Sequence, residues 1–507
     1  MKPLAAEFNA YQWAPSTEEL ARRAGLDPVE ILRFDGNVPP LPLPSTRPAA
    51  IASALARVNE YAHGGYPRIH AAIAEYAGVE PENVVLGAGA DDLLLLAGRA
   101  FAGPGDTVAI PQAPTYPLFR ISAQLAGAEI GDADPALTFC CRPANPTGAL
   151  DPIPDARPLV VDEAYFEYAE DPGAVGLIDD RVVVVRTFSK IFALASARIG
   201  YALASRDIAA ELNARLAPEP VSTISVALAL AALESPPDPA PVIEERERLA
   251  DELRMRGYVP LESRANFLYV PVDDPLEIAD RLLAAGCVVR VFDEAIRISV
   301  RDLEDDDVLL AALDRTEASN SLLQARRARH VRTTTETSLR VRLAVDGASR
   351  VRVSTGAGLY DHFLEQLAFH AGFDLVLEGG GDAETGEHHT AEDAAIALGE
   401  ALDRALGTRT GIARYGDAVV PMDDARADAA IDVGGRRHTS IRIDPDPGLA
   451  QHVLGSFADN ARIALHVESS GRDAHHTAEA AFKATGRALR VALRRESDVL
   501  PSTKGVL

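Results

Sequence analysis

Lysine, cysteine and tryptophan are scarce in this chain of 507 residues, and basic residues are outnumbered by acidic ones. Three cysteines are too few for a disulfide framework. A net charge of -25 argues against nucleic acid or an anionic membrane as a partner. No uninterrupted apolar run is long enough to cross a bilayer, and the first seven residues lack the apolar core of a signal peptide. We therefore expect a cytoplasmic protein.

Only four lysines occur, at Lys2, Lys190, Lys483 and Lys504, against 46 arginines. A chain that uses arginine by default is expected to keep lysine where a primary amine or a compact ammonium group is needed. Ten of the twelve histidines lie from His330 onward, so the two halves differ in their chemistry. The length requires at least two domains, which we place at residues 1–324 and 325–507.

A histidine doublet recurs in the second half. His388-His389-Thr390-Ala391-Glu392-Asp393 returns as His475-His476-Thr477-Ala478-Glu479-Ala480, and each copy leads into a segment with helical periodicity. On a helix the first histidine and the glutamate of each copy share a face, whereas adjacent histidines point about 100° apart. A single doublet would favour a pair of solvated surface histidines. The repeat instead predicts two metal ions, each gathering imidazoles and a carboxylate from different elements or different subunits.

In the first half, strands alternate with helices, which predicts a mostly parallel sheet with ligands at the carboxyl ends of its strands. Residues 84–92 are expected to form a strand, a Gly-rich turn and a helix start, which suits an anion, although the third glycine of a dinucleotide fingerprint is missing. Residues 1–45 are expected to be irregular, and residues 304–323 to form a helix.

The motifs GAGADD, PTYP, NPTG, DEAY, TFSK and ARIGY occur in this order in the first half. Together they resemble a fold type I pyridoxal-phosphate aminotransferase, and above all a histidinol-phosphate aminotransferase. The resemblance implies an α/β domain in which a mostly parallel sheet is flanked by helices, with a small domain added. It also implies that Lys190 carries pyridoxal 5'-phosphate and moves the substrate proton, and that Asp162 pairs with the pyridine nitrogen. The other implied cofactor-binding residues are Tyr61 of a partner subunit, Ala88, Gly89, Ala90, Tyr116, Asn145, Tyr165, Ser189 and Arg198, and Arg290 and Arg297 are candidates for the substrate phosphate.

Residues 325–507 resemble imidazoleglycerol-phosphate dehydratase throughout, which implies an α+β domain built from an internal repeat. Two Mn²⁺ ions per active site are implied by the family rather than by the ligand types, which would bind Zn²⁺ more tightly. The implied metal ligands are His362, His388, His389, Glu392, His466, His475, His476 and Glu479. Substrate-binding residues would be Glu336, Gln366, His370, Arg414, Arg436, Lys483, Ser502 and Lys504, with Glu336 also a candidate catalytic acid or base.

The sequence thus predicts a bifunctional enzyme of histidine biosynthesis, acting on phosphorylated imidazole substrates and glutamate. A homo-oligomer is implied, because the aminotransferases form dimers and the dehydratases form shells of trimers. Alternatives for the first half are an amino-acid-phosphate decarboxylase and a non-catalytic regulatory domain. The chain departs from the family patterns at 35–38, Arg142, Arg301, Glu387 and Gly434, and only 16 residues separate Asn145 from Asp162, so a helix there should be short or missing.

Overall fold

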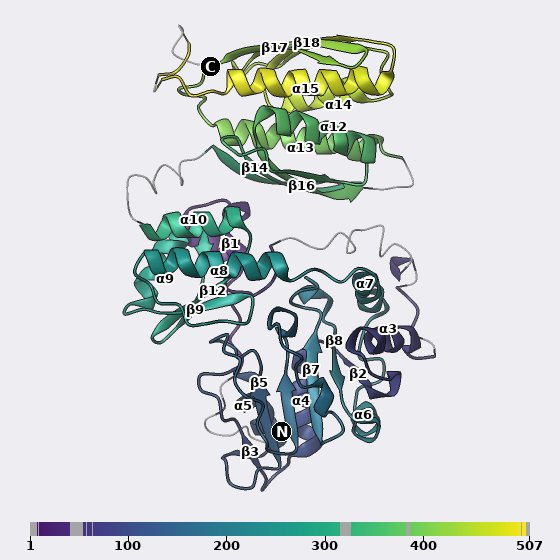
Figure 1. Ribbon diagram of the computed structural model, residues 1–507, viewed down its shortest axis with the longest axis vertical. Helices are drawn as coiled ribbons and strands as arrows, with labels where there is room; N and C mark the ends of the chain where they lie inside the picture. Colours follow the sequence, from purple (N-terminus) through teal and green to yellow (C-terminus); the bar gives the residue numbers. More distant parts are fainter. Residues whose placement is uncertain are drawn as a thin grey trace. The chain divides into compact units, whose positions relative to one another are not determined.

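The computed structural model describes residues 8, 10–40, 54–56, 58–62, 64–314, 326–381, 386–497 and 499–502 (Figure 1). The chain divides into two compact units, Met1–Ser319 and Asn320–Leu507. The domain boundary predicted between residues 324 and 325 lies outside the described residues. Across the described part of the chain, none of the helices is both long and apolar enough to cross a membrane.

A seven-stranded sheet forms the centre of the first unit, in the order β2-β8-β7-β6-β5-β3-β4. Its strands are β2 (Val84–Gly87), β3 (Thr107–Ala109), β4 (Glu129–Ile130), β5 (Leu137–Cys141), β6 (Leu159–Asp162), β7 (Val182–Thr187) and β8 (Gly200–Leu203). Neighbouring strands are parallel except at β8, which runs antiparallel to β2 and to β7. Strands β5, β6 and β7 are buried along their whole length, which explains their continuous apolar runs. This sheet agrees with the predicted mostly parallel one.

Helices cover both faces of this sheet. They are α3 (Pro67–Ala77), α4 (Ala90–Phe101), α5 (Leu118–Ala126), α6 (Arg206–Asn213) and α7 (Thr223–Leu233). One apolar core joins α3 and α7 to the sheet, and a second joins α4, α5 and α6 to it. Successive residues of β7 alternate between these two cores, because side chains of a strand point to opposite faces. No helix lies between Asn145 and Asp162, as the short spacing predicted.

A smaller part of the first unit has a core of its own. It contains the antiparallel sheet β11 (Arg290–Phe292), β12 (Ala295–Ser299) and β9 (Phe267–Pro271), with α8 (Ala240–Met255), α9 (Pro275–Ala284), α10 (Leu303–Asp314) and the parallel pair β1 (Leu32–Arg33) and β10 (Cys287–Val288). Helix α10 is described from Leu303 to Asp314, and the rest of the helix predicted over 304–323 lies outside the described residues.

The expectation that residues 1–45 are irregular was wrong. Helix α1 spans Thr17–Ala24, and β1 follows it. The side chain of Ser16 accepts a hydrogen bond from the amide of Glu19 at 3.1 Å, and Gly25 ends the helix at φ 70°. These are ordinary start and stop signals of a helix, and they outweigh the prolines on either side.

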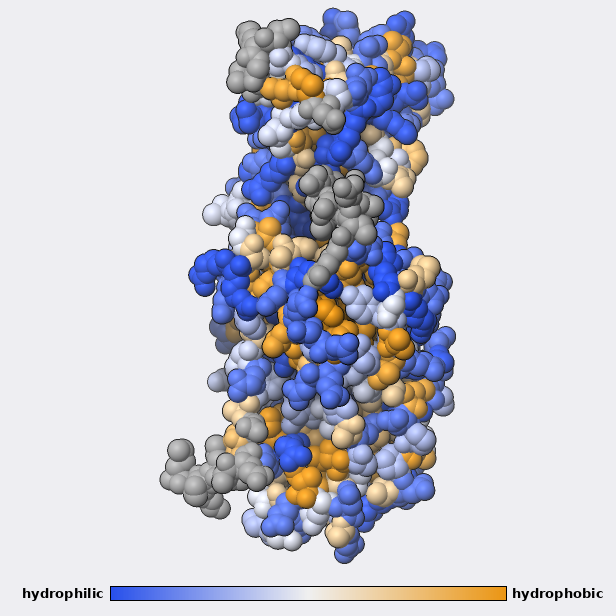
Figure 2. Space-filling model, turned by 90° about the vertical axis from the view of Figure 1, so that its left-hand side faces the viewer, coloured by the Kyte–Doolittle hydropathy of each residue, from blue (hydrophilic) through white to orange (hydrophobic). Residues whose placement is uncertain are grey.

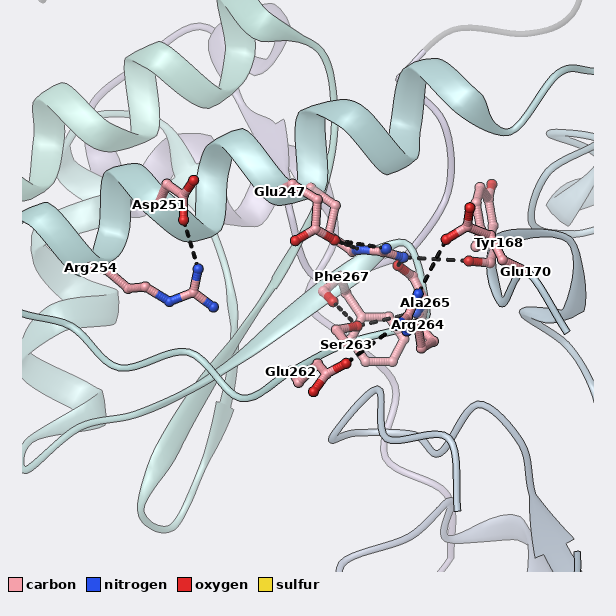
Figure 3. Close-up of polar contacts among 11 residues, drawn as sticks. Tyr168, Glu170, Glu247, Asp251, Arg254, Glu262, Ser263, Arg264, Ala265 and Phe267 are labelled. Carbon is pink, nitrogen blue, oxygen red and sulfur yellow. Dashed lines mark hydrogen bonds and ion pairs between the residues drawn. The ribbon is translucent and has the colours of Figure 1, made fainter. Parts of the chain in front are cut away.

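Buried and half-exposed arginines join the smaller part to the central sheet (Figure 3). Arg246 of α8 is 2% exposed and donates to the carbonyl oxygens of Tyr168 at 3.4 Å and Ala265 at 3.2 Å. Arg264 lies 3.2 Å from Glu170 and donates its amide to the carbonyl oxygen of Gly148. Together these contacts fix where β9 begins relative to the segment after Asp162.

The second unit places four helices between two four-stranded sheets (Figure 1). The sheets have the orders β13-β14-β16-β15 and β17-β18-β20-β19. The elements are β13 (Arg327–Thr333), β14 (Thr337–Ala344), β15 (Val351–Ser354), α12 (Gly358–Ala371), β16 (Asp374–Gly381), α13 (His388–Leu406), β17 (Tyr415–Met422), β18 (Ala425–Asp432), β19 (His438–Asp444), α14 (Ala450–Asn460), β20 (Ala464–Ser470) and α15 (Ala474–Ala492). Each half thus runs three strands, helix, strand, helix. Helix α12 packs on α15 and α13 on α14, around one common core.

Candidate active sites

A cavity of about 380 Å³ lies at the carboxyl ends of β6 and β7 in the first unit. Residues predicted to bind cofactor or substrate make up much of its lining: Ala90, Tyr116, Asn145, Asp162, Tyr165, Ser189, Lys190, Arg198, Arg290 and Arg297. Asp162 ends β6, and Lys190 follows three residues after β7. The adjacent parallel strands therefore bring an acid and an amine from distant parts of the sequence into one cavity.

Among the described residues that line this cavity, Lys190 is the single lysine. Its Nζ lies 3.4 Å from the carbonyl oxygen of Gly36. Burial, and next the guanidinium of Arg297, lower the pKa of Lys190 from 10.5 to about 8. An amine with such a pKa is partly neutral near physiological pH, which is the form that attacks a carbonyl group.

Asp162 is buried beneath the same cavity, at 4% exposure. One of its oxygens accepts the amide hydrogen of Ala164 at 3.1 Å, and the other lies 4.0 Å from Cys141 Sγ. Burial raises the pKa of Asp162 from 3.8 to about 7. A buried carboxyl group of this kind is ready to pair with a cation, such as a protonated ring nitrogen.

Tyr165 and Asn145 lie next to one another in the cavity. The Tyr165 hydroxyl accepts from Asn37 Nδ2 at 3.0 Å and from Asn145 Nδ2 at 3.4 Å. Arg297 donates to Asn145 Oδ1 at 2.6 Å and to the carbonyl oxygen of Asp35 at 2.9 Å. Arg297, predicted as a substrate residue, therefore holds the segment 35–37 and Asn145 in place.

The turn before α4 has the form of an anion cradle. Gly89 caps the helix at φ 89°, and a Cβ there would lie 2.7 Å from Arg198 Nη2. Only glycine fits such a backbone beside that guanidinium. The helix N-terminus, Ser189 and Arg198 form a donor set that suits a phosphate group. Neither Ala88 nor Gly89 belongs to the lining of the cavity itself.

Asp91 is a residue of this cavity that the sequence reasoning missed. Its Oδ1 accepts the Tyr116 hydroxyl at 2.9 Å, and its Oδ2 lies 3.0 Å from Arg198 Nη2. Asp91 therefore holds two of the predicted cofactor-binding residues, Tyr116 and Arg198. Its place in the first turn of α4 was the available signal.

Tyr61 lies elsewhere in the first unit. It is 74% exposed and lines a separate cavity of about 610 Å³ beside α7. Apolar side chains of α7, among them Val226 and Leu230, line the same cavity. Within one chain, Tyr61 is therefore not part of the Lys190 cavity.

In the second unit, both doublets begin a helix, as predicted. His388 is the first residue of α13, and His475 is the second residue of α15. Asp473 caps α15 by accepting the amides of His475 at 2.8 Å and His476 at 3.2 Å. The imidazoles of both doublets thus stand at helix N-termini.

Two clusters of metal-ligating side chains form where the helices pack in pairs. His362 of α12 joins His475 and Glu479 of α15, and His452 of α14 joins His388 and Glu392 of α13. Within each cluster the three ligating atoms lie within 4.8 Å of one another. Glu479 Oε2 is 3.3 Å from His475 Nε2, and Glu392 Oε1 is 3.3 Å from His452 Nε2. Two imidazoles and a carboxylate suit a divalent transition metal.

The structure does not bring every predicted ligand into these clusters. His466 lies on β20, exposed, with its ring 5.1 Å from that of His438. His452, which was not predicted as a ligand, stands in the cluster with His388 and Glu392. The sequence signal for His452 was its position: α14 is the second-half counterpart of α12, which carries His362.

The second histidine of each doublet faces an acid at the tip of a hairpin. His389 Nδ1 lies 3.0 Å from Glu336 Oε2, and His476 Nδ1 lies 2.6 Å from Asp424 Oδ1. Neither His389 nor His476 belongs to either cluster within the described chain. Asp424 was not predicted from the sequence.

Several predicted substrate residues lie around the His475 cluster. Gln366 and His370 follow His362 at helical spacing on α12, so the three share a face. Burial, and next the charges of Lys483 and Arg487, lower the pKa of His370. Lys483 Nζ lies 2.7 Å from Glu479 Oε1. Burial raises the pKa of Glu479, but the hydrogen bond and charge of Lys483, together with the charges of His362 and His475, leave that pKa lowered overall.

The other predicted substrate-binding residues lie outside α12 and α15. Arg414 makes a two-point ion pair with Asp432 at 2.7 and 3.0 Å and donates to the carbonyl oxygen of Pro501, next to Ser502. Arg436 is exposed. Lys504 lies outside the described residues.

Some departures from the family patterns have local explanations. Arg142 pairs with Asp171 and donates to the carbonyl oxygen of Asp151 at 2.8 Å, so it clamps the loop that replaces a helix before β6. Arg301 pairs with Asp305 at 2.8 Å and donates to the carbonyl oxygen of Arg33. Nothing in the structure explains Glu387.

In comparisons with known proteins, each half of the chain matches a protein family. The family "Aminotransferase class I and II" matches residues 29–134 and 130–313, and "Imidazoleglycerol-phosphate dehydratase" matches residues 355–489. An imidazoleglycerol-phosphate dehydratase of Salinispora tropica is 44% identical over 205 residues, covering 36% of this chain and 100% of that protein.

Solved structures resemble the first half. A histidinol-phosphate aminotransferase from Sinorhizobium meliloti, in complex with pyridoxal-5'-phosphate, is 27% identical with a TM-score of 0.54, covering 63% of this chain and 99% of that one. An L-threonine-O-3-phosphate decarboxylase from Porphyromonas gingivalis covers 56% of this chain and 98% of its own, with a TM-score of 0.50 and 18% identity, a likeness of fold alone.

Proposed function

Because the chain belongs to the aminotransferase class I and II family through residues 29–313 and to the imidazoleglycerol-phosphate dehydratase family through its C-terminal part, we propose a bifunctional enzyme of histidine biosynthesis. The C-terminal unit dehydrates imidazoleglycerol phosphate to imidazole-acetol phosphate. The N-terminal unit transaminates this ketone with glutamate, giving L-histidinol phosphate and 2-oxoglutarate. The observation that carries this proposal is that one chain holds a half-buried Lys190 and a buried Asp162 in one cavity, and also two clusters of imidazoles with a carboxylate.

Pyridoxal phosphate, when bound, withdraws electrons from the substrate carbon that loses its proton. Lys190 would hold this cofactor through its amine and carry the proton, which its lowered pKa favours. Asp162 would keep the ring nitrogen protonated. Asn145 and Tyr165 would hydrogen-bond the phenolic oxygen, and the α4 N-terminus, Ser189 and Arg198 would bind the phosphate.

For the substrate phosphate of the first unit, the contacts favour Arg290 over Arg297. Arg297 already donates to Asn145 and to Asp35, whereas Arg290 lines the cavity from the neighbouring strand. We assign Arg297 to positioning Asn145 and Arg290 to the substrate anion.

In the second unit, the two clusters would each hold one Mn²⁺, and such ions polarise the bound imidazole of the substrate. His452 replaces His466 in this assignment. Glu336 is the candidate acid or base, because half of its side chain is exposed beside His389. His370 and Gln366 would line the substrate, and Lys483, Arg414, Arg436, Ser502 and Lys504 would bind its phosphate.

We also propose that the site is completed by other copies of the chain. Each cluster offers three ligands; outside the clusters, His389 is exposed and His476 is half-buried. These two imidazoles would each reach an ion held by a neighbouring copy, as in an assembly of trimers. Tyr61, exposed beside the apolar face of α7, would reach the Lys190 cavity of a partner in an aminotransferase dimer.

The proposal predicts the products of the intact protein. Given imidazoleglycerol phosphate, glutamate, Mn²⁺ and pyridoxal phosphate, it should make histidinol phosphate and 2-oxoglutarate without a second enzyme. Mass spectrometry of the products decides between an aminotransferase and an amino-acid-phosphate decarboxylase, because the decarboxylase would release CO₂ and no 2-oxoglutarate.

Removal of the Lys190 amine should abolish one activity and leave the other. Lys190→Ala is expected to abolish transamination and the absorbance of the bound cofactor, while dehydration proceeds at the wild-type rate and the ketone accumulates. Arg181→Ala, on the exposed turn before β7, serves as the matched control. A folded Lys190→Ala protein in which dehydration falls as far as transamination would contradict two independent sites.

A further inference from the structure

The turn between β17 and β18 carries an acid whose two oxygens are both engaged. Asp424 Oδ1 lies 2.6 Å from His476 Nδ1. Its Oδ2 accepts the backbone amides of Arg472 at 2.6 Å and Asp473 at 3.1 Å. The Asp424 side chain is 16% exposed. This acid therefore ties the hairpin to the first turn of α15 and also to one imidazole of the doublet.

The chemistry of this contact fixes the tautomer of His476. An ionised carboxylate can only accept hydrogen bonds, so Nδ1 of His476 must carry the hydrogen. The lone pair of the neutral ring is then on Nε2, the nitrogen left for a metal ion. Nε2 lies 3.6 Å from Asp423 Oδ2, which is longer than a hydrogen bond.

The first half of the unit repeats this arrangement. The turn between β13 and β14 carries Glu336, whose Oε2 lies 3.0 Å from His389 Nδ1. The two acids differ in how firmly they are held, because Glu336 is 50% exposed and Asp424 is 16% exposed. Glu336 can leave His389 to meet a substrate, whereas Asp424 is anchored by two backbone amides as well.

We propose that Asp424 is a positioning residue for His476, which fixes the ring and its tautomer so that Nε2 is presented to a divalent metal ion. The assignment rests on the proposed metal-dependent dehydratase. It gives the two hairpin acids different tasks, since Glu336 stays available for proton transfer and Asp424 does not. Carboxylate partners of this kind commonly change metal affinity 10- to 100-fold when removed.

The test is Asp424→Asn, which keeps the size of the side chain. An amide can accept on one side only. If its oxygen faces Arg472 and Asp473, its NH₂ group donates to Nδ1 and forces the hydrogen of His476 onto Nε2. If its oxygen faces His476, the two backbone amides lose their acceptor. The control is Asp417→Asn. Asp417 is exposed on β17 of the same hairpin, so this variant makes the same change in charge away from His476.

The readout is Mn²⁺ binding to the metal-free full chain, followed by calorimetry and by the electron paramagnetic resonance of the bound ion. We expect wild type and Asp417→Asn to bind two ions per chain, and Asp424→Asn to bind one of them about 10- to 100-fold more weakly. In a His476→Ala background, adding Asp424→Asn should have no further effect on affinity. Asp424→Glu, which keeps a carboxylate, should restore most of the affinity.

The outcomes separate this inference from the function on which it rests. Absence of Mn²⁺ binding by the wild-type chain would overturn the metal-dependent dehydratase. Two ions bound by Asp424→Asn within twofold of the wild-type affinity would overturn only the role of Asp424. Should Asp424→Asn not fold, Asp424→Ser takes its place, because a hydroxyl can still accept from the backbone amides but cannot reach the ring.

Discussion

At the scale of single residues, burial sets the acid–base chemistry of the Lys190 cavity. Burial raises the pKa of Asp162 to about 7, and burial with the charge of Arg297 lowers the pKa of Lys190 to about 8. An acid and a base whose pKa values both lie near neutrality can hold or release protons at physiological pH, which is typical of catalytic sites. A cationic ring nitrogen placed beside Asp162 would lower the pKa of that carboxyl group again.

The raised pKa of Asp162 predicts a stability that falls with pH. Below the unfolded-state pKa of about 4 the carboxyl group is protonated in both states, and its stabilising effect is complete. That effect is lost as pH rises through the folded-state pKa of about 7. We expect the cofactor-free first unit to melt several degrees lower at pH 7.5 than at pH 5.5. Lys190 adds little to the change between pH 5.5 and pH 7.5, because its folded-state pKa of about 8 lies above this range.

Differential scanning calorimetry of Asp162→Asn checks this prediction. Burial also raises the pKa of Glu167 to about 7, so Glu167 should contribute to the fall in melting temperature with pH. Asp162→Asn is therefore expected to make that fall smaller but not to abolish it. Asp155→Asn, an exposed acid in the preceding loop, should leave the slope unchanged. An equal slope in Asp162→Asn and wild type would contradict the buried, protonated carboxyl group.

Residues that belong to a local motif were predictable, and residues that act from a distant element were not. Asp162 ends one strand and Lys190 closely follows the next. Because the two strands were expected to be parallel, both residues were expected at the same edge of the sheet. His452 and Asp424 are isolated in the sequence and meet their partners only through packing of α14 on α13 and of the β17–β18 turn on α15. Arg297 was expected at the substrate, but its burial commits it to Asn145.

At the scale of elements, two glycines let the helix pairs of the second unit touch. A Cβ at Gly399 of α13 would meet the carbonyl oxygen of Phe457 on α14, and one at Gly486 of α15 would meet that of Leu367 on α12. Both contacts would be closer than real side chains allow. These are the same helix pairs that carry the two metal-ligating clusters.

Alanine at either position should therefore separate the paired helices. Gly399→Ala or Gly486→Ala is expected to destabilise the unit by about 1 to 3 kcal/mol and to weaken Mn²⁺ binding at the corresponding cluster. Gly455→Ala on α14 is the matched control, because its nearest neighbour would be 3.9 Å away, and it should stabilise the helix by up to about 1 kcal/mol. Urea unfolding measures the free energy of unfolding of the three variants. A Gly486→Ala protein more stable than wild type would contradict the close contact between α12 and α15.

Helix starts were predicted correctly where apolar periodicity and capping residues agreed. They were missed where the segment was rich in proline. The doublets begin α13 and α15 as expected. Helix α1 was missed, although Ser16, Glu19 and Gly25 supply its start and stop. Short strands such as β1 depend on the partner β10, far along the chain, and no local pattern reveals that pairing.

At the scale of the whole molecule, ions shared between copies would make assembly depend on metal. Chelation is expected to stop dehydration and to reduce the particle mass measured by light scattering, while transamination by the first unit continues. Returning Mn²⁺ should restore both the mass and dehydration. A chelated protein that keeps its size and its dehydratase activity would contradict ligands contributed across subunits.

Two consecutive activities on one chain need not pass their intermediate directly. We expect free diffusion of the ketone, because tethering raises a local concentration without creating a closed path. The measurement feeds labelled imidazoleglycerol phosphate together with excess unlabelled ketone. Strong dilution of the label in histidinol phosphate is the expected result, and undiluted label would instead demonstrate direct transfer.

The nested pairing of the helices, with α13 on α14 inside α12 on α15, also sets the order in which a growing chain can complete its sites. His388 and Glu392 leave the ribosome well before His452, and His362 leaves it well before His475 and Glu479. By then every residue of the Lys190 cavity has long been translated. A nascent chain can therefore complete the Lys190 cavity before it completes either of the two clusters.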